Sequence, residues 1–445
     1  MTVTESARAF RGVRWVGACA DLTPEARRLL LERTTSANDA ELRARTATII
    51  GDVRSRGDDA LRAMASELDG VTLSSLEVPM AECRAALEAL DPALRAAMER
   101  AAGNIRGVHE AFRPVGQEVE SEPGVVVGRR PDPLGRVGVY APGGRAAYPS
   151  SVLMGVIPAR IAGVGEVIVC SPPSRETGRP SNVVLAAAAL AGADRMFALG
   201  GAGAIAAMAY GTASVPRVDR IVGPGNAYVA EAKLQVASAV AIDSPAGPSE
   251  LLVLGDEIAD PRLIAREMMA QAEHDPMAAV VAVVTSRPLA DAVVAAIAEA
   301  LPSQPRADIV AAALEGQGAV LWTESIDEAV TFANTYAAEH LLLLAASPDE
   351  VLPRVRNAGT VFVGAYASVA FGDYMTGANH VLPTGGLARS YSGLSTLDFV
   401  RWTTYQRVTQ AAASRLAEDV GVFATAEGLG GHALAARWWR EGAAV

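Results

Sequence analysis

RVGVYA at residues 136–141, EVIVC at 166–170 and RMFAL at 195–199 are short apolar runs, and each precedes a longer alanine-rich segment. The long segments are PSSVLMGVIPARIAG (149–163), NVVLAAAALAG (182–192) and AIAAMAYG (204–211), and RIVG (220–223) closes the series. Short apolar runs predict buried strands, and the alanine-rich segments predict helices. Their regular alternation predicts βαβ units on a mostly parallel sheet.

A second alternating series begins at Glu250. Its segments are LLVLG (251–255), LIAREMMAQAEH (263–274), AAVVAVVT (278–285), LADAVVAAIAEAL (289–301), AVLWT (319–323), IDEAVTFANTYAAEH (326–340), LLLLA (341–345) and TVFVG (360–364). A chain of 445 residues exceeds the size of one ordinary core. Two series in tandem therefore predict two sheet domains; a duplication would explain them, but spacing alone does not prove it.

The segments on either side of the two series have a different character. Residues 24–35, 39–68 and 91–112 carry apolar residues at three- and four-residue spacing and predict helices, and a Pro- and Gly-rich change follows at 122–133. After Pro383 the chain is glycine-rich, then helical to about Ala424. It breaks at residues 428–431 and ends in a short helix with Trp438 and Trp439. This tail is too small for a core of its own and is expected to pack on the main body or on a partner subunit.

Composition narrows the classes of partner and compartment. The net charge is −11 and Lys and Arg form no long runs, so nucleic acid and anionic membrane are not expected partners. The three cysteines, Cys19, Cys83 and Cys170, are far apart, which argues against a disulfide framework or a cysteine zinc site. The N-terminus lacks the apolar core of a signal peptide, and the uncharged stretch 196–216 is broken by Gly, Ser, Thr and Pro. We therefore expect a cytoplasmic protein.

The histidines point to chemistry. The chain has five, and four of them stand near a carboxylate or an amide: His274 after Gln271 and Glu273, His340 after Glu339, His380 after Asp373, and His432 after Glu427. Imidazole beside carboxylate favours a metal site or an acid–base site. The fragment that runs from Gly372 to Thr384, GDYMTGANHVLPT, places Asp, Asn and His within thirteen residues.

Two of these groups allow more than one interpretation. Gln271 and His274 are three residues apart on a predicted helix, so they share a face and can meet one ion; alternatively, His274 only interacts with the helix dipole. Adding Asp373 and His432 gives four N/O ligands, which suits zinc, manganese or cobalt. Glu339 and His340 precede a buried strand, which suits acid–base work, although a solvated helix end would look the same.

Two further features have plain alternatives. Residues 201–206 read G-x-G-x-x-A between an apolar run and a helix, with Asp219 further on, which fits either a dinucleotide site or a tight strand–helix turn. Cys170 ends a predicted strand and could serve as a thiol nucleophile, but a small buried hydrophobe is the stronger interpretation.

Seven phrases of the chain, taken together, resemble the histidinol dehydrogenase family. They are GRVGVYAPGGRAAYPSSVLM (135–154), GPGNAYVAEAK (223–233), DSPAGPSELLV (243–253), MAQAEHDP (269–276), AAEHL (337–341), GDYMTGANHVLPTGG (372–386) and AEGLGGHA (426–433). The resemblance runs from about Arg54 onward. One departure is Gly203, which stands where the family usually has a glutamine that helps to hold the cofactor or substrate.

The resemblance implies a zinc-dependent oxidation of L-histidinol through the aldehyde to L-histidine, with two NAD consumed and one Zn²⁺ per subunit. It implies that zinc is held by Gln271, His274, Asp373 and His432, the last contributed by the partner subunit of a homodimer. The other implied roles are His340 as general base, Glu339 as activator of water, Ser249, His380 and Glu427 beside the substrate together with the zinc ligands, and Tyr140 and Asn226 as NAD contacts. In this family the zinc positions the substrate and a cysteine nucleophile is not required.

We therefore expect an α/β enzyme with two incomplete Rossmann-like domains, helical N-terminal segments and a C-terminal helical arm. The expected division is 1–125 for the N-terminal helical segment packing on the second α/β domain, 126–248 for the NAD side, 249–382 for the metal and catalytic residues, and 383–445 for a dimer-swapped arm. A dehydrogenase of the same family acting on another alcohol, such as a sulfonated diol, is the alternative substrate class. A non-catalytic metal-binding scaffold is the rival class, but it would not need Glu339 and His340.

Overall fold

The computed structural model describes residues 12–33, 39–143 and 147–441, so the last residues of the predicted helix 24–35 lie outside the described residues. The chain forms two compact units. The first contains Met1–Phe112 and Leu134–Phe399, and the second contains Arg113–Pro133 and Val400–Val445. Each unit is described by itself.

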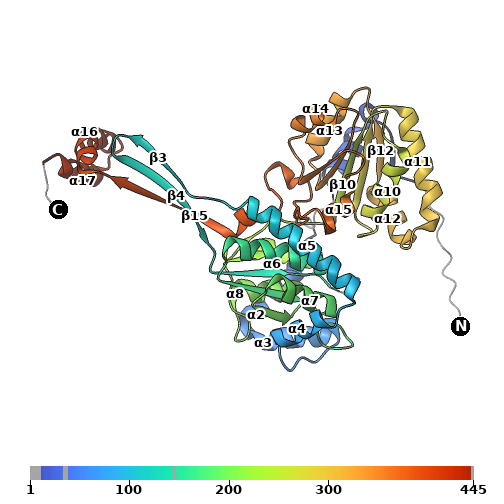
Figure 1. The fold of residues 1–445 in the computed structure, drawn as a ribbon, viewed down its shortest axis with the longest axis horizontal. Helices are drawn as coiled ribbons and strands as arrows, with labels where there is room; N and C mark the ends of the chain where they lie inside the picture. Colours follow the sequence, from blue (N-terminus) through green and yellow to red (C-terminus); the bar gives the residue numbers. More distant parts are fainter. Residues whose placement is uncertain (1–11, 34–38, 144–146, 442–445) are drawn as a thin grey trace. The chain divides into compact units, whose positions relative to one another are not determined.

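The first unit contains two six-stranded sheets (Figure 1). In one sheet the order is β2-β7-β6-β5-β8-β9, and every pairing is parallel except β2 with β7. Its strands are β2 (Glu77–Val78), β5 (Arg136–Tyr140), β6 (Glu166–Ser171), β7 (Arg195–Ala198), β8 (Arg220–Val222) and β9 (Ala241–Ile242). Helices α6 (Pro149–Ala162), α7 (Asn182–Ala191), α8 (Gly201–Tyr210) and α9 (Ala227–Val236) connect its strands.

The other sheet is parallel throughout, in the order β1-β12-β11-β10-β13-β14. Its strands are β1 (Trp15–Ala18), β10 (Glu250–Gly255), β11 (Ala279–Val284), β12 (Ala319–Trp322), β13 (His340–Leu344) and β14 (Thr360–Val363). All residues of β10 and β11 are buried, as expected of central strands covered on both faces. Helices α10 (Pro261–Ala272), α11 (Arg287–Ala300) and α12 (Ala307–Gln317) lie on one side, and α13 (Ile326–Tyr336) contributes to the core on the other. The short α14 (Pro348–Val351) and α15 (Val369–Tyr374) complete this part of the chain.

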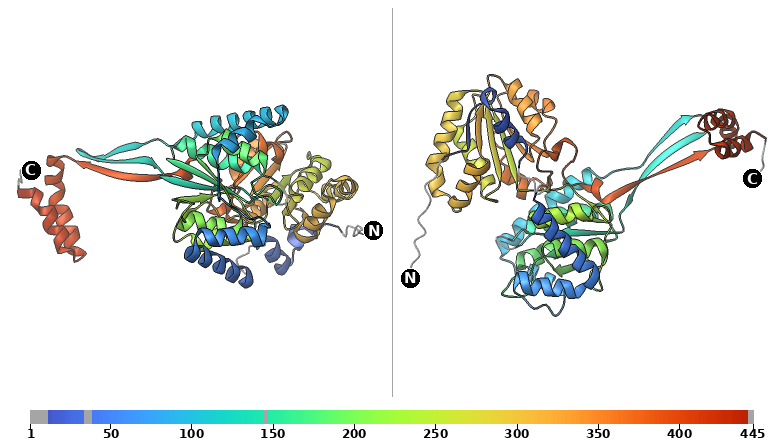
Figure 2. Two further views of the ribbon diagram at one scale, coloured as in Figure 1. Left: turned by 90° about the horizontal axis from the view of Figure 1, so that it is seen from below. Right: turned by 180° about the vertical axis from the view of Figure 1, so that it is seen from behind.

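The N-terminal region divides between the two sheets, whereas the sequence predicts that it packs on the second α/β domain. Strand β1 runs beside β12 in the second sheet (Figure 2), and Leu30 of α1 (Pro24–Leu31) lies in that sheet's core. The later helices pack on the first sheet. There α2 (Ala40–Arg56) contacts α8 and α9, and α3 (Asp58–Met64) follows it; α4 (Met80–Glu88) contacts α7, and α5 (Pro92–Ala111) contacts α6. An amphipathic pattern shows that a helix face is buried but not which neighbour buries it, so the pattern could not resolve this division.

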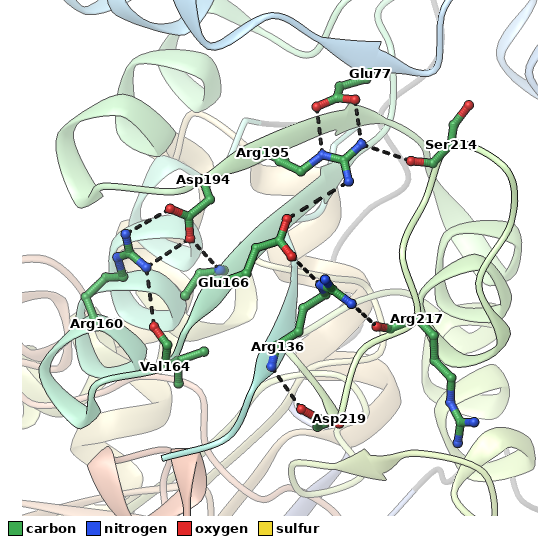
Figure 3. Close-up of polar contacts among 11 residues, drawn as sticks. Glu77, Arg136, Arg160, Val164, Glu166, Asp194, Arg195, Ser214, Arg217 and Asp219 are labelled. Carbon is green, nitrogen blue, oxygen red and sulfur yellow. Dashed lines mark hydrogen bonds and ion pairs between the residues drawn. The ribbon is translucent and has the colours of Figure 1, made fainter.

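The amino ends of the first sheet carry arginine–carboxylate pairs (Figure 3). Arg195 makes two bonds to Glu77, of 2.8 and 2.6 Å, and Arg136 pairs with Glu166. These groups join the starts of β2, β5, β6 and β7. The carboxyl ends of the parallel strands lie at the opposite edge, and that edge contributes to the candidate site.

The second unit is a three-stranded antiparallel sheet followed by two helices. The sheet has the order β15-β4-β3, formed by β3 (Gln117–Glu122), β4 (Val125–Pro133) and β15 (Val400–Val408). Helices α16 (Gln410–Ala426) and α17 (Gly430–Arg437) pack against each other. In the described part of the chain, helices that combine the length and apolarity needed to cross a membrane are absent. The predicted α/β class with parallel sheets and a C-terminal helical arm is confirmed, while the exact four-part division stays a prediction.

Candidate active site

A cavity of about 540 Å³ in the first unit collects most of the residues singled out in the sequence. The carboxyl edge of the first sheet contributes the segments after β5 and β8, and the amino edge of the second sheet contributes the residues that precede or begin β10, β11 and β13. Its lining includes Ser249, Gln271, His274, Glu339, His340, Asp373, His380 and Asn226. The structure thus brings together eight side chains that are widely spread in the sequence.

Gln271 and His274 enter the cavity from the end of α10. The helix ends at Ala272, and the following Asp275-Pro276 prevents its continuation because the residue before proline disfavours helical geometry. Gln271 is 2% exposed, and its amide Nε2 lacks a hydrogen-bond partner. A buried amide without a partner is costly, so this side chain is suited to a ligand that is not part of the polypeptide.

His340 begins β13 and is buried. Its Nδ1 lies 2.9 Å from the carbonyl oxygen of Glu250 on the neighbouring strand β10. A carbonyl oxygen only accepts, so Nδ1 carries a proton in this bond, and in the neutral form of the ring Nε2 keeps its lone pair. Nε2 is buried without a hydrogen-bond partner, and it lies 3.8 Å from Oδ1 of Asp373. In its neutral form the histidine therefore presents an unpaired acceptor nitrogen to the cavity.

Glu339 lies directly before β13, and its carboxylate is held by the main chain. Its Oε2 accepts from the Glu250 N–H at 2.7 Å and lies 3.4 Å from Nδ1 of His340. Burial raises the pKa of Glu339, and the His340 imidazole opposes that shift. Burial by itself lowers the pKa of His340, but the carboxylates of Glu339 and Asp373 outweigh it and raise that pKa to about 9. Glu339 and His340 thus titrate together, as a coupled pair that can hold or release a proton.

Asp373 and His380 come from α15 and the segment after it. His380 Nδ1 donates to the main-chain carbonyl of Asp373 at 3.0 Å, which fixes the ring. Burial lowers the pKa of His380, while Asp373 raises it. His380 is therefore suited to act as a neutral hydrogen-bonding group in the cavity.

A second cavity, of about 340 Å³, lies at the carboxyl edge of the first sheet. The Gly201 N–H at the start of α8 donates to the Tyr140 hydroxyl at 3.0 Å, and burial raises the pKa of Tyr140 to about 12. Asn226 caps α9 by accepting from the Val229 N–H, and together with Gly143 it lines both cavities. The two cavities are therefore neighbours, with Gly143 and Asn226 between them.

Gly203 lines the second cavity beside Leu61 and Met64. A Cβ at residue 203 would lie 3.1 Å from the Met64 sulfur and 3.4 Å from Leu61 Cδ2. Apolar side chains from α3 thus press against this glycine, and a longer side chain would need them to move. The G-x-G-x-x-A pattern begins a helix as predicted, and its first glycine, Gly201, has a φ of 60°.

Glu427 and His432 belong to the second unit. Glu427 follows α16, His432 lies in the first turn of α17, and both are exposed. The described residues contain no cluster of three or more His, Cys, Asp or Glu side chains that could hold a metal ion. In the first unit the expected ligand set has only two members of those types, His274 and Asp373, because its third member is an amide.

Sequence reasoning missed Arg33 and Glu250, which form a buried ion pair next to Glu339. Glu250 does lie within the phrase DSPAGPSELLV, but its partner is 217 residues away in the sequence and gives no local signal. Cys170 is completely buried, and burial raises its pKa to about 12, which agrees with a packing role.

Comparison with known proteins identifies the family. A family model described as histidinol dehydrogenase matches residues 32–439. Histidinol dehydrogenase from Natronomonas pharaonis is 51% identical over 419 residues, covering 94% of this chain and 98% of that protein. The protein of the same name from Xanthomonas euvesicatoria is 45% identical, with 91% and 94% covered. The crystal structure of histidinol dehydrogenase from Elizabethkingia anophelis superposes with a TM-score of 0.91 at 31% identity, covering 98% and 99% of the two chains. This chain therefore belongs to the histidinol dehydrogenase family of oxidoreductases.

Proposed function

We propose that this protein oxidises L-histidinol to L-histidine in two NAD-linked steps, with L-histidinaldehyde between them. The observation that carries the proposal is the paired arrangement of Glu339 and His340 beside the cavity. His340 Nδ1 is committed to the Glu250 carbonyl, and its Nε2 is buried without a partner. A base for an alcohol needs a free nitrogen of this kind close to the reacting oxygen.

Each step has its own proton to move. In the first, His340 Nε2 accepts the hydroxyl proton of the alcohol while the carbinol hydride passes to NAD, and the aldehyde forms. In the second, Glu339 accepts a proton from water as the water oxygen adds to the aldehyde carbon, and a second hydride passes to a second NAD. His340 again accepts a hydroxyl proton as the carboxylate forms.

The residues present fit a divalent metal. Gln271, His274 and Asp373 line one cavity, where the Gln271 side chain can offer its carbonyl oxygen to a cation. An amide, an imidazole and a carboxylate form an N/O donor set that suits Zn²⁺, which when bound would orient the imidazole and amine of the substrate. Gln271, His274 and Asp373 would hold it together with His432 of a second copy of this chain. Ser249, His380 and Glu427 would line the substrate site.

The second cavity fits the cofactor. It combines main-chain N–H groups at the start of α8 with the Tyr140 hydroxyl and Asn226, and it shares Gly143 and Asn226 with the first cavity. A dinucleotide bound there would place its reactive ring beside the substrate, with Tyr140 and Asn226 as contacts. Gly203 removes one side-chain contact that the family resemblance would assign to this site.

The exposed second unit supports a homodimer with shared sites. Phe423, Leu434 and Trp438 are 70%, 73% and 62% exposed, and large apolar groups at such exposure favour burial against a partner. We infer a cytoplasmic enzyme of histidine synthesis that assembles as a dimer through this unit, and nucleic acid and membrane are not among its expected partners.

Two variants test the assignment of roles. His340→Asn should slow both oxidation steps by ~10²–10⁴-fold, because each needs a base near the reacting oxygen. Glu339→Gln should damage aldehyde oxidation more than alcohol oxidation, because only the aldehyde step adds water. The first NADH formed from L-histidinol in a single turnover reports the alcohol step, and NADH formation from added L-histidinaldehyde reports the aldehyde step. Equal losses in the two steps for Glu339→Gln would refute the role given to Glu339.

A further inference from the structure

Arg33 is buried and forms an ion pair with Glu250, whose carboxylate contacts Glu339 of the candidate catalytic pair. It follows α1 and is 4% exposed. Its Nε and Nη2 donate to Oε1 and Oε2 of Glu250, at 2.8 and 2.7 Å, in a bidentate geometry. The guanidinium also stacks over the Tyr336 ring, with 3.6 Å between Cζ and the ring centroid. A planar fork of this kind fixes both partners more firmly than a lysine would.

The same guanidinium holds a strained turn. Nη1 donates to the Tyr336 carbonyl at 2.9 Å and Nη2 to the Ala337 carbonyl at 3.3 Å. Ala337 has a φ of 53°, and no other non-glycine residue in the described ranges has a positive φ. A residue with a Cβ adopts this conformation only where its surroundings enforce it. The turn leads directly into Glu339, so Arg33 fixes the approach of the chain to that residue.

Glu250 completes the connection. Its carboxylate accepts from the Glu339 N–H at 3.4 Å and from the Gly385 N–H at 2.6 Å. Its own N–H donates to the Glu339 carboxylate at 2.7 Å. The main chain and the side chain of Glu339 are therefore both hydrogen-bonded to Glu250 on β10. The Glu250 carboxylate is in turn paired with Arg33.

The His340 ring, like the Glu339 carboxylate, bonds to the main chain of Glu250. His340 differs because the residue itself lies within the β10–β13 ladder, paired with Leu251. The ladder does not require the Arg33 side chain. Loss of Arg33 is thus expected to loosen Glu339 more than His340.

We propose that Arg33 and Glu250 are positioning residues that aim the Glu339 carboxylate at the substrate cavity, and so govern the aldehyde step more than the alcohol step. The proposal rests on the function proposed above for Glu339. The alternative is a purely structural ion pair that stabilises the second sheet. The structural alternative predicts equal damage to both steps.

Two variants test it in the full-length, zinc-loaded protein. Arg33→Lys keeps the charge and loses the fork, while the double variant Arg33→Gln/Glu250→Gln leaves neither residue charged and serves if the single variant does not fold. For both we expect kcat for L-histidinaldehyde to fall by roughly 10- to 100-fold, the scale of a small misplacement of a catalytic group. The KM for the aldehyde should change by less than about threefold. The rate at which the first NADH forms from L-histidinol, measured in a single turnover, should also change by less than about threefold, because the β10–β13 ladder holds His340.

The same changes are then made in a Glu339→Gln background. Because the positioned carboxylate is gone, aldehyde oxidation should fall less than about threefold further. The matched control is Arg195→Lys, which alters another bidentate pair, with Glu77, at the far edge of the first sheet (Figure 3). It should leave the ratio of the two steps unchanged.

The outcomes distinguish the positioning role of Arg33 and Glu250 from the catalytic role of Glu339. A full-sized loss in the Glu339→Gln background, or equal losses in both steps, would overturn the positioning role and leave the proposed function intact. Wild-type rates for Arg33→Lys and for the double variant would overturn it equally. Wild-type aldehyde oxidation by Glu339→Gln alone would instead refute the role of Glu339, and the positioning proposal would fail with it.

Discussion

Replacing Lys233 with methionine should loosen the loop that joins the two cavities. Lys233 and Asp243 form an ion pair with side chains 2% and 4% exposed. Lys233 Nζ donates to the Gly223 carbonyl at 3.0 Å, and the Gly223 N–H donates to Asp243 Oδ2 at 2.7 Å. Gly223 has a φ of 113°, and a Cβ there would lie 2.1 Å from the Tyr140 carbonyl oxygen. The ion pair thus holds both the N–H and the carbonyl of Gly223, the residue at which the loop that contains Asn226 begins.

The magnitude follows from what each variant leaves unpaired. Lys233→Met leaves Asp243 buried without its cation, and breaking a buried pair in this way costs about 3–5 kcal/mol. Adding Asp243→Asn removes the charge but keeps an oxygen that can accept from Gly223. The double variant then lacks mainly the bond to the Gly223 carbonyl, worth about 1–3 kcal/mol. The double variant should therefore be about 2 kcal/mol more stable than the single one, by the difference between these two ranges.

Thermal unfolding followed by circular dichroism measures the order of the midpoints, and steady-state kinetics measures the KM for NAD. We expect wild type to be most stable, the double variant next and Lys233→Met least. Because the loop carries Asn226, the KM for NAD should rise more than kcat falls. A double variant less stable than Lys233→Met, or an unchanged KM for NAD in Lys233→Met, would refute the reasoning.

Three further predictions concern the metal, the thiol and the assembly. Because one expected ligand is a weakly binding amide, EDTA should remove zinc and activity together, and added Zn²⁺ should restore both; full activity in metal-free protein would contradict this. Burial raises the pKa of the Cys170 thiol to about 12, so iodoacetamide at pH 8 should leave it unmodified in the folded protein, as mass spectrometry would show, whereas rapid alkylation would contradict its burial. A chain lacking residues 427–445 should be inactive, and mixing it with His274→Ala should restore some activity, since one site of the mixed dimer would be complete; an inactive mixture with mixed dimers present would mean that His432 ligates within its own chain.

Much of the fold could be predicted from the sequence because parallel strands buried on both faces appear as short apolar runs. EVIVC corresponds to β6, RMFAL to β7 and LLLLA to the body of β13. Strand β2 could not be anticipated, since two residues, Glu77 and Val78, carry no periodic signal. The packing of α2, α4 and α5 on the first sheet could not be predicted either, because amphipathic helices fit any apolar surface.

Part of the candidate site could be predicted from the sequence, for a different reason. His340, Asp373 and the other scarce polar groups stand out locally, so their residue types could be identified before their arrangement. Their convergence depends on one sheet contributing its carboxyl edge and the other its amino edge, and strand–helix alternation does not encode that relation. Arg33 and Glu250 are the sharper example, because an ion pair across 217 residues is a property of the folded chain.

The most direct test of the account is the stoichiometry of the complete reaction. Limiting L-histidinol is converted with excess NAD, NADH is measured by absorbance and the product by chromatography, beside a panel of amino alcohols and sulfonated diols. The account predicts that L-histidinol is the preferred substrate and that each molecule yields about two NADH and one L-histidine, since each of the two oxidation steps delivers one hydride to a cofactor. One NADH with accumulating aldehyde, or a sulfonated diol oxidised in preference to L-histidinol, would contradict it.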